Sequence, residues 1–500
     1  MGLFPELHGR RLYSWGNFIC GLSFMMYGYD AGILGGLFLH PPFIDALGLA
    51  DASQYTIPMI ASAYSLAGCI TSVIMAMFSF RLGRRRTILL GNAAACIGTV
   101  LQAASYSVAQ IIVGRICTGF AIGCISSAVP IYIAETGIEA GDRGPANAFN
   151  AMMLIGGVPI AYWIDYGFTK MYTQASWRVP IALQAVFFVV GGGCMYLLPD
   201  TPRWYYAVNR TEEGDAALVR LVDAPLDDEK VQAIKQEILL SIQSEREANA
   251  SLHWKLFLTL GVVDHSPLKI VRRLSTCFWL PFIREWMGSG LMATYSSIIL
   301  AKTGASPSLI SLLSGIQNIV FFLGCVPIYF TMERTGRRIT LLMGAVAMTV
   351  LLVVFIALVA IEPQTQSMLW AAIAILWLYL FTMGYAYQGV VWLYCAEIPP
   401  LAYRHIGGAA TSTGEWLGTF LNVFVGPIGF DNVGWRYWFW VLSGNLTAIV
   451  FVYFLCPETG GRTLEQIDYL FAPEVSNPKD GWAAAETVEN KEANTTEIRE

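Results

Sequence analysis

Some charged residues stand well inside stretches of the sequence that are otherwise apolar enough to cross a bilayer, and five of them could do chemistry together. They are Asp30, Arg115, Arg284, Glu285 and Glu415. An isolated arginine in hydrocarbon costs at least ~2.5 to 3.5 kcal/mol, so Arg115 is expected to face a polar partner and not lipid. Side chains placed in this way can form ion pairs, bind a proton or contact a polar solute. Their types and positions therefore point to solute binding and proton transfer.

Bond-making chemistry is not indicated. The sequence offers no set of nucleophile, base and orienting group, no metal site and no phosphate-binding loop. The ten cysteines stand singly in apolar segments, which favours packing over metal binding or disulfides. No basic stripe suggests nucleic acid. We therefore expect a protein that is not an enzyme and that needs no cofactor.

The composition identifies an integral membrane protein. Hydrophobic residues make up 55% of the chain and charged residues 13%, far from the average of soluble domains. Runs of roughly 20 apolar residues, each long enough to span a bilayer, predict an all-α membrane protein with twelve transmembrane helices. The runs lie near residues 13–38, 55–78, 87–106, 108–134, 148–168, 179–198, 272–300, 309–331, 339–361, 367–396, 405–428 and 435–456.

Short motifs recur in the same order at offsets of 253 to 262 residues, which indicates a duplicated chain of two similar halves. An Arg-x-Gly-Arg-Arg motif begins at Arg81 and again at Arg334. A Tyr-x-Ala-Glu motif ends at Glu135 and again at Glu397. The other pairs are Arg143 with Arg404, Trp177 with Trp435, and Pro199 with Pro457.

The distribution of basic residues predicts the orientation. Nine arginines fall in the short loops on one side of the predicted membrane: Arg81, Arg84, Arg85, Arg86, Arg143, Arg334, Arg337, Arg338 and Arg404. The opposite loops carry only Lys170, Arg178, Lys302 and Arg436. Cytoplasmic loops are enriched in arginine and lysine, so this side and both termini are expected in the cytoplasm.

These patterns divide the chain into six segments. We expect a cytoplasmic tail (1–12), a six-helix bundle (13–198), a cytoplasmic linker with amphipathic helices (199–271), a second six-helix bundle (272–456), a cytoplasmic segment (457–476) and a disordered acidic tail (477–500).

The ordered set of motifs resembles the sugar porter family of the major facilitator superfamily, and most of all fungal sugar-transporter-like proteins. The resemblance rests on Gly28-Tyr29-Asp30, Gly114-Arg115, Pro130-x-Tyr132-x-Ala134-Glu135, Arg143-Gly144, Pro199-Asp-Thr-Pro202-Arg203-Trp204, Glu333-Arg334-x-Gly336-Arg337-Arg338, Trp392 with Glu397, and Pro457 to Asp468. It implies the major facilitator fold, in which two pseudo-symmetric six-helix bundles rock about a central site.

Asp30 and Arg115 are the candidate proton-coupling pair. Asp30 lies about 15 residues into a helix that enters from the cytoplasm, and Arg115 about eight residues into one that enters from outside, so the two reach similar depth. The resemblance implies the same pair, as in proton-coupled members. Protonation of Asp30 would weaken its hold on Arg115 and link proton binding to helix movement. The alternative is a fixed buried salt bridge in a facilitator.

The repeated arginines are expected to form a cytoplasmic gate that latches the two bundles, in which they meet the carboxylates at Glu135 and Glu397 and the amides of neighbouring helix ends. The first copy departs from the family, because Phe80 stands where an acidic residue is usual. A simple orientation signal would explain the arginines but not the two glutamates. The candidate gate residues are Arg84, Arg85, Glu135, Arg143, Glu333, Arg334, Arg337, Arg338, Glu397 and Arg404.

The central cavity departs further from the family. Arg284-Glu285 replaces a Gln-Gln pair, and Gly290, Ala151 and Glu415 replace other amides that normally read sugar hydroxyls. A free Arg284 would favour an anionic substrate, whereas an Arg284 neutralised by Glu415 or Glu285 would suit a neutral polyol or merely pack. The candidate substrate residues are Arg284, Glu285, Gly288, Trp392, Glu415, Trp416, Asn150 and Tyr295.

The sequence thus predicts a secondary transporter that moves a sugar, sugar acid or polyol by alternating access, as a proton symporter. The alternatives are a facilitated uniporter, an exporter of a secondary metabolite, and a nutrient sensor that does not transport. A sensor normally carries a long signalling tail, and about 40 residues after Pro457 are few for one. The expected partners are the substrate, protons and membrane lipid, for a monomeric unit in the plasma membrane.

Overall fold

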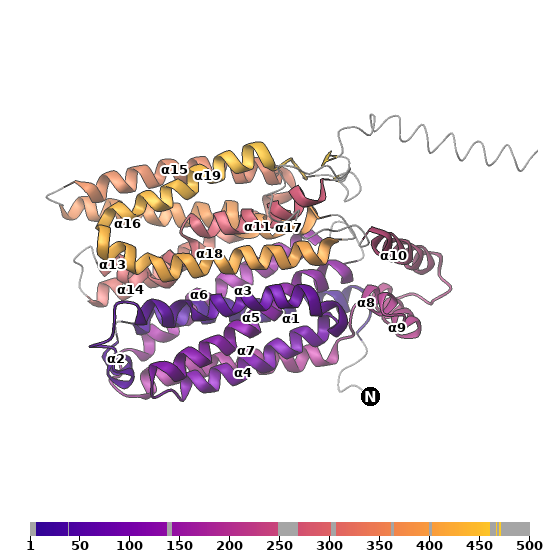
Figure 1. Ribbon diagram of the computed structural model, residues 1–500, viewed down its shortest axis with the longest axis horizontal. Helices are drawn as coiled ribbons and strands as arrows, with labels where there is room; N and C mark the ends of the chain where they lie inside the picture. Colours follow the sequence, from indigo (N-terminus) through magenta and orange to yellow (C-terminus); the bar gives the residue numbers. More distant parts are fainter. Residues whose placement is uncertain are drawn as a thin grey trace, which may run out of the picture.

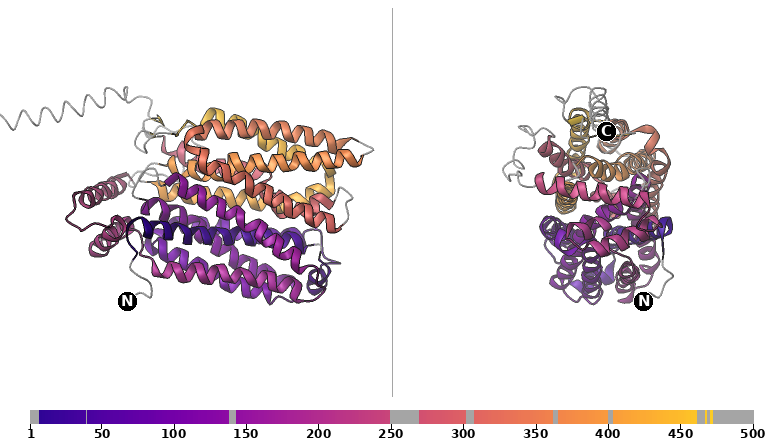
Figure 2. Two further views of the ribbon diagram at one scale, coloured as in Figure 1. Left: turned by 180° about the vertical axis from the view of Figure 1, so that it is seen from behind. Right: turned by 90° about the vertical axis from the view of Figure 1, so that its right-hand side faces the viewer.

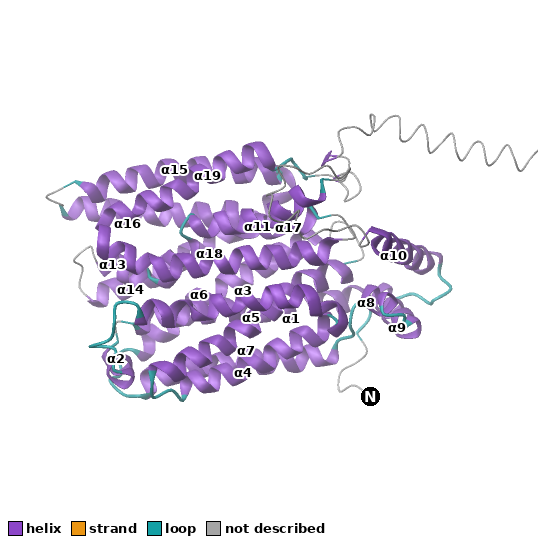
Figure 3. Cartoon of the chain, viewed as in Figure 1, coloured by secondary structure: helices purple, strands orange, loops and turns teal. Residues whose placement is uncertain are grey.

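The structure is a computed structural model in which the described residues form helices joined by loops and turns, with no strand among them (Figure 3). These residues are 7–38, 40–137, 143–248, 269–301, 307–361, 365–399, 403–460, 467 and 470–471. The predicted tail over 477–500 and most of the segment before it lie outside this set. The first described half comprises α1 (Gly9–Leu37), α2 (Pro41–Leu47), α3 (Thr56–Leu82), α4 (Arg84–Ala103), α5 (Val108–Thr136), α6 (Arg143–Phe168) and α7 (Ala175–Leu197).

The second half follows a helical linker. The linker holds α8 (Pro202–Ala207), α9 (Thr211–Val222) and α10 (Glu229–Ala248). The second half comprises α11 (Ile270–Trp286), α12 (Ser289–Thr294), α13 (Ser296–Ala301), α14 (Pro307–Thr335), α15 (Arg337–Ala360), α16 (Gln366–Met383), a π-helical turn (Gly384–Gln388), α17 (Gly389–Glu397), α18 (Arg404–Val433), a 3-10 turn (Gly434–Tyr437) and α19 (Trp438–Leu455).

The two halves form two bundles that lie side by side (Figures 1 and 2). The axes of the long helices are roughly aligned with one another, as expected for helices that cross a bilayer. Helices α8, α9 and α10 project beyond the bundles at one end, where α1 begins. We call this the linker end, and the opposite end, where α2 lies, the far end (Figure 1).

Nine described helical spans are long and apolar enough to cross a membrane. The difference from the twelve predicted runs has three local causes. Helix α4 begins with three arginines, α18 and α19 are joined directly by the 3-10 turn and count as one span from Ile406 to Leu455, and the run over 272–300 is broken. These three features account for every one of the twelve runs.

The break in the run over 272–300 corrects the expectation of a continuous helix there. Gly288 has a φ of +92°, a left-handed conformation that favours glycine, and its N–H donates to the carbonyl of Glu285 at 2.8 Å. A Cβ at this position would also lie 3.3 Å from Val441. The chain therefore ends α11 at Trp286 and restarts as α12, just beyond the charged residues of α11.

Close contacts between helix backbones position the two helices that carry Asp30 and Arg115. A Cβ on Gly28 would lie 1.7 Å from the carbonyl oxygen of Leu154, so α1 touches α6 backbone to backbone beside Asp30. A Cβ on Gly119 would lie 2.2 Å from the carbonyl oxygen of Tyr64, so α5 meets α3 in the same way. Small residues allow this approach between membrane helices.

The linker helices are amphipathic, as the charge pattern predicts. Leu218 and Leu221 of α9 are buried, while Glu212 and Glu213 of the same helix are exposed. Asp215 joins α9 to its neighbours, since it pairs with Lys235 of α10 at 2.7 Å and accepts the hydroxyl of Tyr206 of α8 at 2.6 Å. This carboxylate therefore connects all three linker helices.

Candidate functional site

Asp30 of α1 and Arg115 of α5 form a buried ion pair. Oδ2 of Asp30 accepts a hydrogen bond from Nη1 of Arg115 at 2.9 Å, and both side chains are at most 2% exposed. Among the described residues, Oδ1 of Asp30 has no hydrogen-bond partner. The structure thus brings together the two residues whose depths match in the sequence.

Arg115 is also anchored independently of the Asp30 side chain. Its Nε donates to the carbonyl of Ile60 at 3.3 Å and its Nη2 to the carbonyl of Ala61 at 3.1 Å, both on α3. Its guanidinium lies 4.2 Å from the centre of the Tyr64 ring. Loss of the carboxylate charge would leave the arginine with polar contacts on α3.

Arg284 of α11 lies at the centre of a second charged cluster, in the C-terminal bundle. Its Nη2 donates to Glu285 at 2.6 Å and also to Glu415 of α18. Its Nη1 donates to Gln388 at 2.8 Å. All three charged side chains are at most 3% exposed. Arg284 is therefore neutralised, which is the second of the two cases that the sequence left open.

Gln388 is a member of this cluster that the sequence analysis missed. It is the last residue of the π-helical turn that joins α16 to α17, and such turns frequently mark functional sites. The available signal was a single amide within the apolar run 367–396. Its role as a partner of Arg284 depends on the extra residue of the π turn, which no short motif encodes.

Aromatic side chains join the two charged clusters across the bundle interface. Trp416 follows Glu415 on α18, and its ring lies 4.7 Å from that of Tyr27 on α1 and 5.9 Å from that of Tyr64 on α3. Its Nε1 donates to the hydroxyl of Ser126 on α5 at 3.0 Å. Trp416 therefore contacts three helices of the other bundle.

The other predicted substrate residues lie further from the charges. Trp392 of α17 is edge-on to Phe24 of α1 at 6.2 Å, and Asn150 of α6 donates to Asn17 of α1 at 2.6 Å. Gly288 lies in the break after α11 and faces Val441. The structure brings Arg284, Glu285, Glu415 and Trp416 together. It places Trp392 and Asn150 outside their immediate contacts, while Gly288 reaches only the backbone carbonyl of Glu285.

Tyr295 lies towards the far end, where the bundles also touch. Its hydroxyl donates to the carbonyl of Val423 at 3.0 Å, and its ring stacks on Phe38 of α1 at 6.1 Å. Contacts between the bundles therefore occur on both sides of the central charges, at Phe38–Tyr295 and at Phe24–Trp392. The central charges are enclosed in this arrangement.

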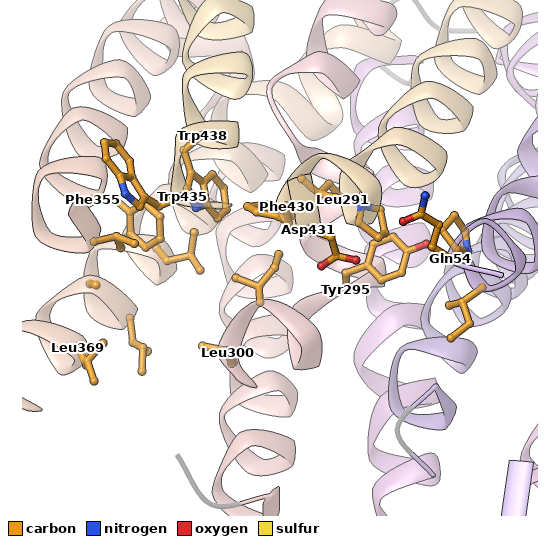
Figure 4. Close-up of a pocket in the computed structure, with 18 of the residues that line it drawn as sticks. Gln54, Leu291, Tyr295, Leu300, Phe355, Leu369, Phe430, Asp431, Trp435 and Trp438 are labelled. Carbon is orange, nitrogen blue, oxygen red and sulfur yellow. The ribbon is translucent and has the colours of Figure 1, made fainter. Parts of the chain in front are cut away.

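A cavity of about 400 Å³ opens on the far-end side of Tyr295. Its lining is mostly apolar and includes Phe355, Trp435 and Trp438. Figure 4 shows Gln54 and Tyr295 at the edge nearest the N-terminal bundle, Asp431 next to Tyr295 towards the middle, and Phe355 and Leu369 at the opposite edge. The polar groups thus gather where the cavity approaches the other bundle.

The predicted gate arginines form two matching clusters at the linker end. In the first, the carboxylate of Glu135 at the end of α5 accepts hydrogen bonds from Arg84 at 2.8 Å and from the hydroxyl of Thr201 at 2.5 Å. Asp200 accepts the backbone N–H of Arg85 at 3.2 Å. The cluster connects the end of α5, the start of α4 and the segment after α7.

The second cluster repeats the first in the C-terminal bundle. The carboxylate of Glu397 at the end of α17 accepts hydrogen bonds from Arg337 at 3.1 Å and from the hydroxyl of Thr459 at 2.8 Å. Glu458 accepts the backbone N–H groups of Arg337 at 2.7 Å and Arg338 at 3.0 Å. These described contacts join parts of one bundle, whereas the sequence analysis expected a latch between the bundles.

The partners Thr201 and Thr459 were not singled out in the sequence. They belong to the repeated Pro-Asp-Thr and Pro-Glu-Thr segments that begin at Pro199 and Pro457, so the signal was present. Arg334 is exposed and Arg404 is half-buried. The side chains of the remaining candidates, Arg143 and Glu333, lie outside the described part of the chain.

The family of the chain follows from its similarity to known proteins. Residues 17–471 match the family model described as "Sugar (and other) transporter". The chain belongs to the sugar transporter family. It is therefore a multi-pass membrane transporter and not an enzyme.

Two relatives of this sugar transporter family member come from fungi. The MFS-type transporter oryC of Aspergillus oryzae is 31% identical over 94% of this chain and 87% of its own length. The sugar transporter STL1 of Saccharomyces cerevisiae is 26% identical over 96% of this chain and 84% of its own length. The similarity thus extends over nearly the whole transporter.

The fold matches a solved transporter. The proton:xylose symporter XylE, in a structure with bound 6-bromo-6-deoxy-D-glucose, gives a TM-score of 0.78 over 92% of this chain and 99% of its own, at 20% identity. This sugar transporter family member therefore has the major facilitator fold that the repeated motifs predict, with twelve transmembrane helices in two bundles.

Proposed function

We propose that this transporter is a proton-coupled symporter of a neutral sugar or polyol, which works by alternating access. The buried Asp30–Arg115 pair carries the proposal. One oxygen of Asp30 holds the arginine at 2.9 Å, and the other has no partner among the described residues. A proton on the free oxygen removes the negative charge and weakens the pair, which links proton binding to movement of α1 against α5.

Arg284 supports a neutral substrate over a sugar acid. A substrate carboxylate would have to displace Glu285 or Glu415 from this arginine, and each holds it by a charge-assisted contact. The cluster instead offers fixed donors and acceptors to hydroxyl groups, as does Gln388 with its amide. Trp416 supplies an aromatic face beside them. Arg284, Glu285, Glu415 and Trp416 are thus the proposed core of the substrate site.

The linker end is proposed to face the cytoplasm of a plasma-membrane protein. Arg84, Arg85, Arg337 and Arg338 gather at this end, together with the linker helices, as the enrichment of arginine on the cytoplasmic side requires. The two clusters around Glu135 and Glu397 then brace the cytoplasmic ends of their bundles. We assign them the role of gate supports, which keep helix ends in place while the bundles close.

A facilitated uniporter is the second candidate. The observation in its favour is the anchorage of Arg115 on the carbonyls of Ile60 and Ala61, which holds the arginine whether or not Asp30 is charged. In that case the ion pair fixes the register of α1 and α5 and carries no proton.

Uptake by the purified chain in liposomes tests the proposed function. Labelled D-xylose, D-glucose, sorbitol and D-glucuronate are offered with and without an inward proton gradient. A symporter concentrates a neutral compound above its outside level only with the gradient. A uniporter equilibrates that compound in both conditions, and binding without entry of any compound would favour a sensor. Preferential uptake of D-glucuronate would contradict the proposed neutral substrate.

A further inference from the structure

The central cluster holds more negative than positive charge. Arg284 is its one cation among the described residues, whereas Glu285 and Glu415 are both carboxylates. With both carboxylates ionised, the cluster carries one unbalanced negative charge. All three side chains are at most 3% exposed, and an unbalanced charge at that depth is strongly unfavourable. A proton is the simplest neutralising partner in the enclosed arrangement.

The contacts distinguish the two carboxylates. Glu285 is satisfied as an anion, because Oε1 accepts Arg284 at 2.6 Å and Oε2 accepts the backbone N–H of Gly290 at 3.0 Å. In Glu415, only Oε1 accepts a hydrogen bond from Arg284. Its Oε2 is buried and has no hydrogen-bond partner in the described part of the structure. A proton on Oε2 of Glu415 therefore breaks no described hydrogen bond.

The surrounding helices add no free positive charge to the described environment of Glu415. Arg115 lies beyond Tyr64 and is paired with Asp30. The amide of Gln388 is neutral and accepts from Arg284. The titratable and charged groups that face the cluster are Tyr27 of α1, Tyr64 of α3, Cys325 of α14, and Arg284 and Glu285 of α11.

We propose that Glu415 is a second proton site of this transporter, and that its proton moves with the substrate in addition to the one on Asp30. The transport part of this proposal rests on the proton coupling proposed above. A proton from water on one side forms an O–H bond at Oε2 when the cavity is open to that side. It returns to water on the other side after the bundles have rocked. Neutralisation of the cluster permits closure around the substrate.

Infrared difference spectroscopy of the full chain in liposomes tests the site without a substrate. Protein labelled with 13C-glutamate separates glutamate bands from those of aspartate. On acidification, a protonated-carboxyl band should appear in wild type and in Asp30→Asn, and one component should be lost in Glu415→Gln. An unchanged set of glutamate bands in Glu415→Gln would overturn the proposal.

Glu285→Gln gives a second, independent variant. It removes the excess negative charge but keeps Glu415 and its arginine. The Glu415 band should then titrate at a lower pH than in wild type, because Arg284 has one carboxylate fewer to neutralise. A midpoint that stays in place would overturn the argument from excess charge.

Accumulation of labelled D-xylose at zero membrane voltage measures the coupling. With an inward gradient of one pH unit, two coupled protons give about hundredfold accumulation and one gives about tenfold. We expect about hundredfold in wild type and about tenfold in Glu415→Gln. Tenfold in both would overturn the second site and leave the proposed symport intact. Entry of D-xylose without any effect of the gradient would overturn both.

Discussion

At the scale of single residues, the transporter has two groups of buried charged side chains that differ in the ratio of positive to negative charge. Asp30 and Arg115 form a balanced pair, whereas Arg284 serves two carboxylates at once. A buried ion pair contributes little net stability, but removal of one partner costs about 3 to 5 kcal/mol because it leaves an uncompensated charge. Substitutions that change the charge should therefore have large and separable effects.

Asp30→Asn should lower proton-driven accumulation about tenfold for an inward gradient of one pH unit, and should leave counterflow exchange of the same labelled sugar. The amide keeps the shape of the side chain and cannot release a proton, so the movement loses the proton that Asp30 carries. Asp165→Asn is the matched control, since Asp165 is an equally buried carboxylate whose oxygens have no hydrogen-bond partner among the described residues. Normal accumulation in Asp30→Asn would show that the pair only fixes the packing of α1 and α5.

Arg284→Gln should lower the thermal unfolding midpoint of the purified protein, because two buried carboxylates lose their cation. The free energy of unfolding should fall by about 3 to 5 kcal/mol. Arg284→Gln with Glu415→Gln should recover part of it, since one carboxylate is then removed as well. An Arg284→Gln protein as stable as wild type would contradict the neutralising role of this arginine.

At the scale of elements, the two gate clusters show how a duplicated motif is used. Each holds a helix end with an arginine, a glutamate and a threonine hydroxyl, namely Arg84, Glu135 and Thr201 in one bundle. Arg337, Glu397 and Thr459 take the same roles in the other. The clusters therefore stabilise the same end of both bundles, where closure needs rigid helix ends.

Glu397→Gln should bias the transporter towards the state that is open at the linker end. The amide weakens the contact with Arg337, so the ends of α15 and α17 hold the closed arrangement less firmly. The accessibility of single cysteines to a membrane-impermeant reagent should rise at the linker end and fall at the far end. Glu135→Gln is the matched variant in the other bundle. Unchanged labelling at both ends would reject the role as a gate support.

The linker should lose stability in acid through Asp215. Burial acts to raise the pKa of Asp215, but the hydrogen bonds from Lys235 and Tyr206 hold that pKa below its ordinary value. The contribution is therefore complete above the unfolded pKa of about 3.9 and is lost as the pH falls through the lower folded pKa. Hydrogen-exchange protection of α9 and α10 should fall over that range in wild type. In Asp215→Asn it should be lower already at neutral pH, and an equal acid response in this variant would contradict the assignment.

At the scale of the whole molecule, the duplication and the fold were predictable because they depend on long-range repetition. The motif offsets gave the two halves, and the matched depths of Asp30 and Arg115 predicted their contact. The sequence offered Glu285 and Glu415 as partners of Arg284 but could not decide between a free and a neutralised arginine, because that depends on the rotation of α18. Gln388 was missed because its position depends on the π turn before α17. The break at Gly288 was missed for a similar reason, since an apolar run looks the same whether its backbone is continuous or not.

The two bundles give these local contacts their functional meaning. Trp416 touches the opposite bundle beside the central charges, while Phe38–Tyr295 and Phe24–Trp392 close the space on either side. Rocking of the bundles would open one of these closures at a time and expose Asp30 and the central cluster to one side of the membrane. In the proposed mechanism, proton and substrate binding are controlled by the same movement.

The most direct test of this account is proton movement during sugar entry. Liposomes that contain the purified protein and a trapped pH-sensitive dye start with equal pH inside and outside, and the membrane voltage is clamped at zero. A labelled neutral sugar that the protein transports is then added outside. The account predicts that its entry acidifies the interior in wild type and not in the double variant Asp30→Asn with Glu415→Gln. Entry of the sugar into wild-type liposomes at constant internal pH would contradict it.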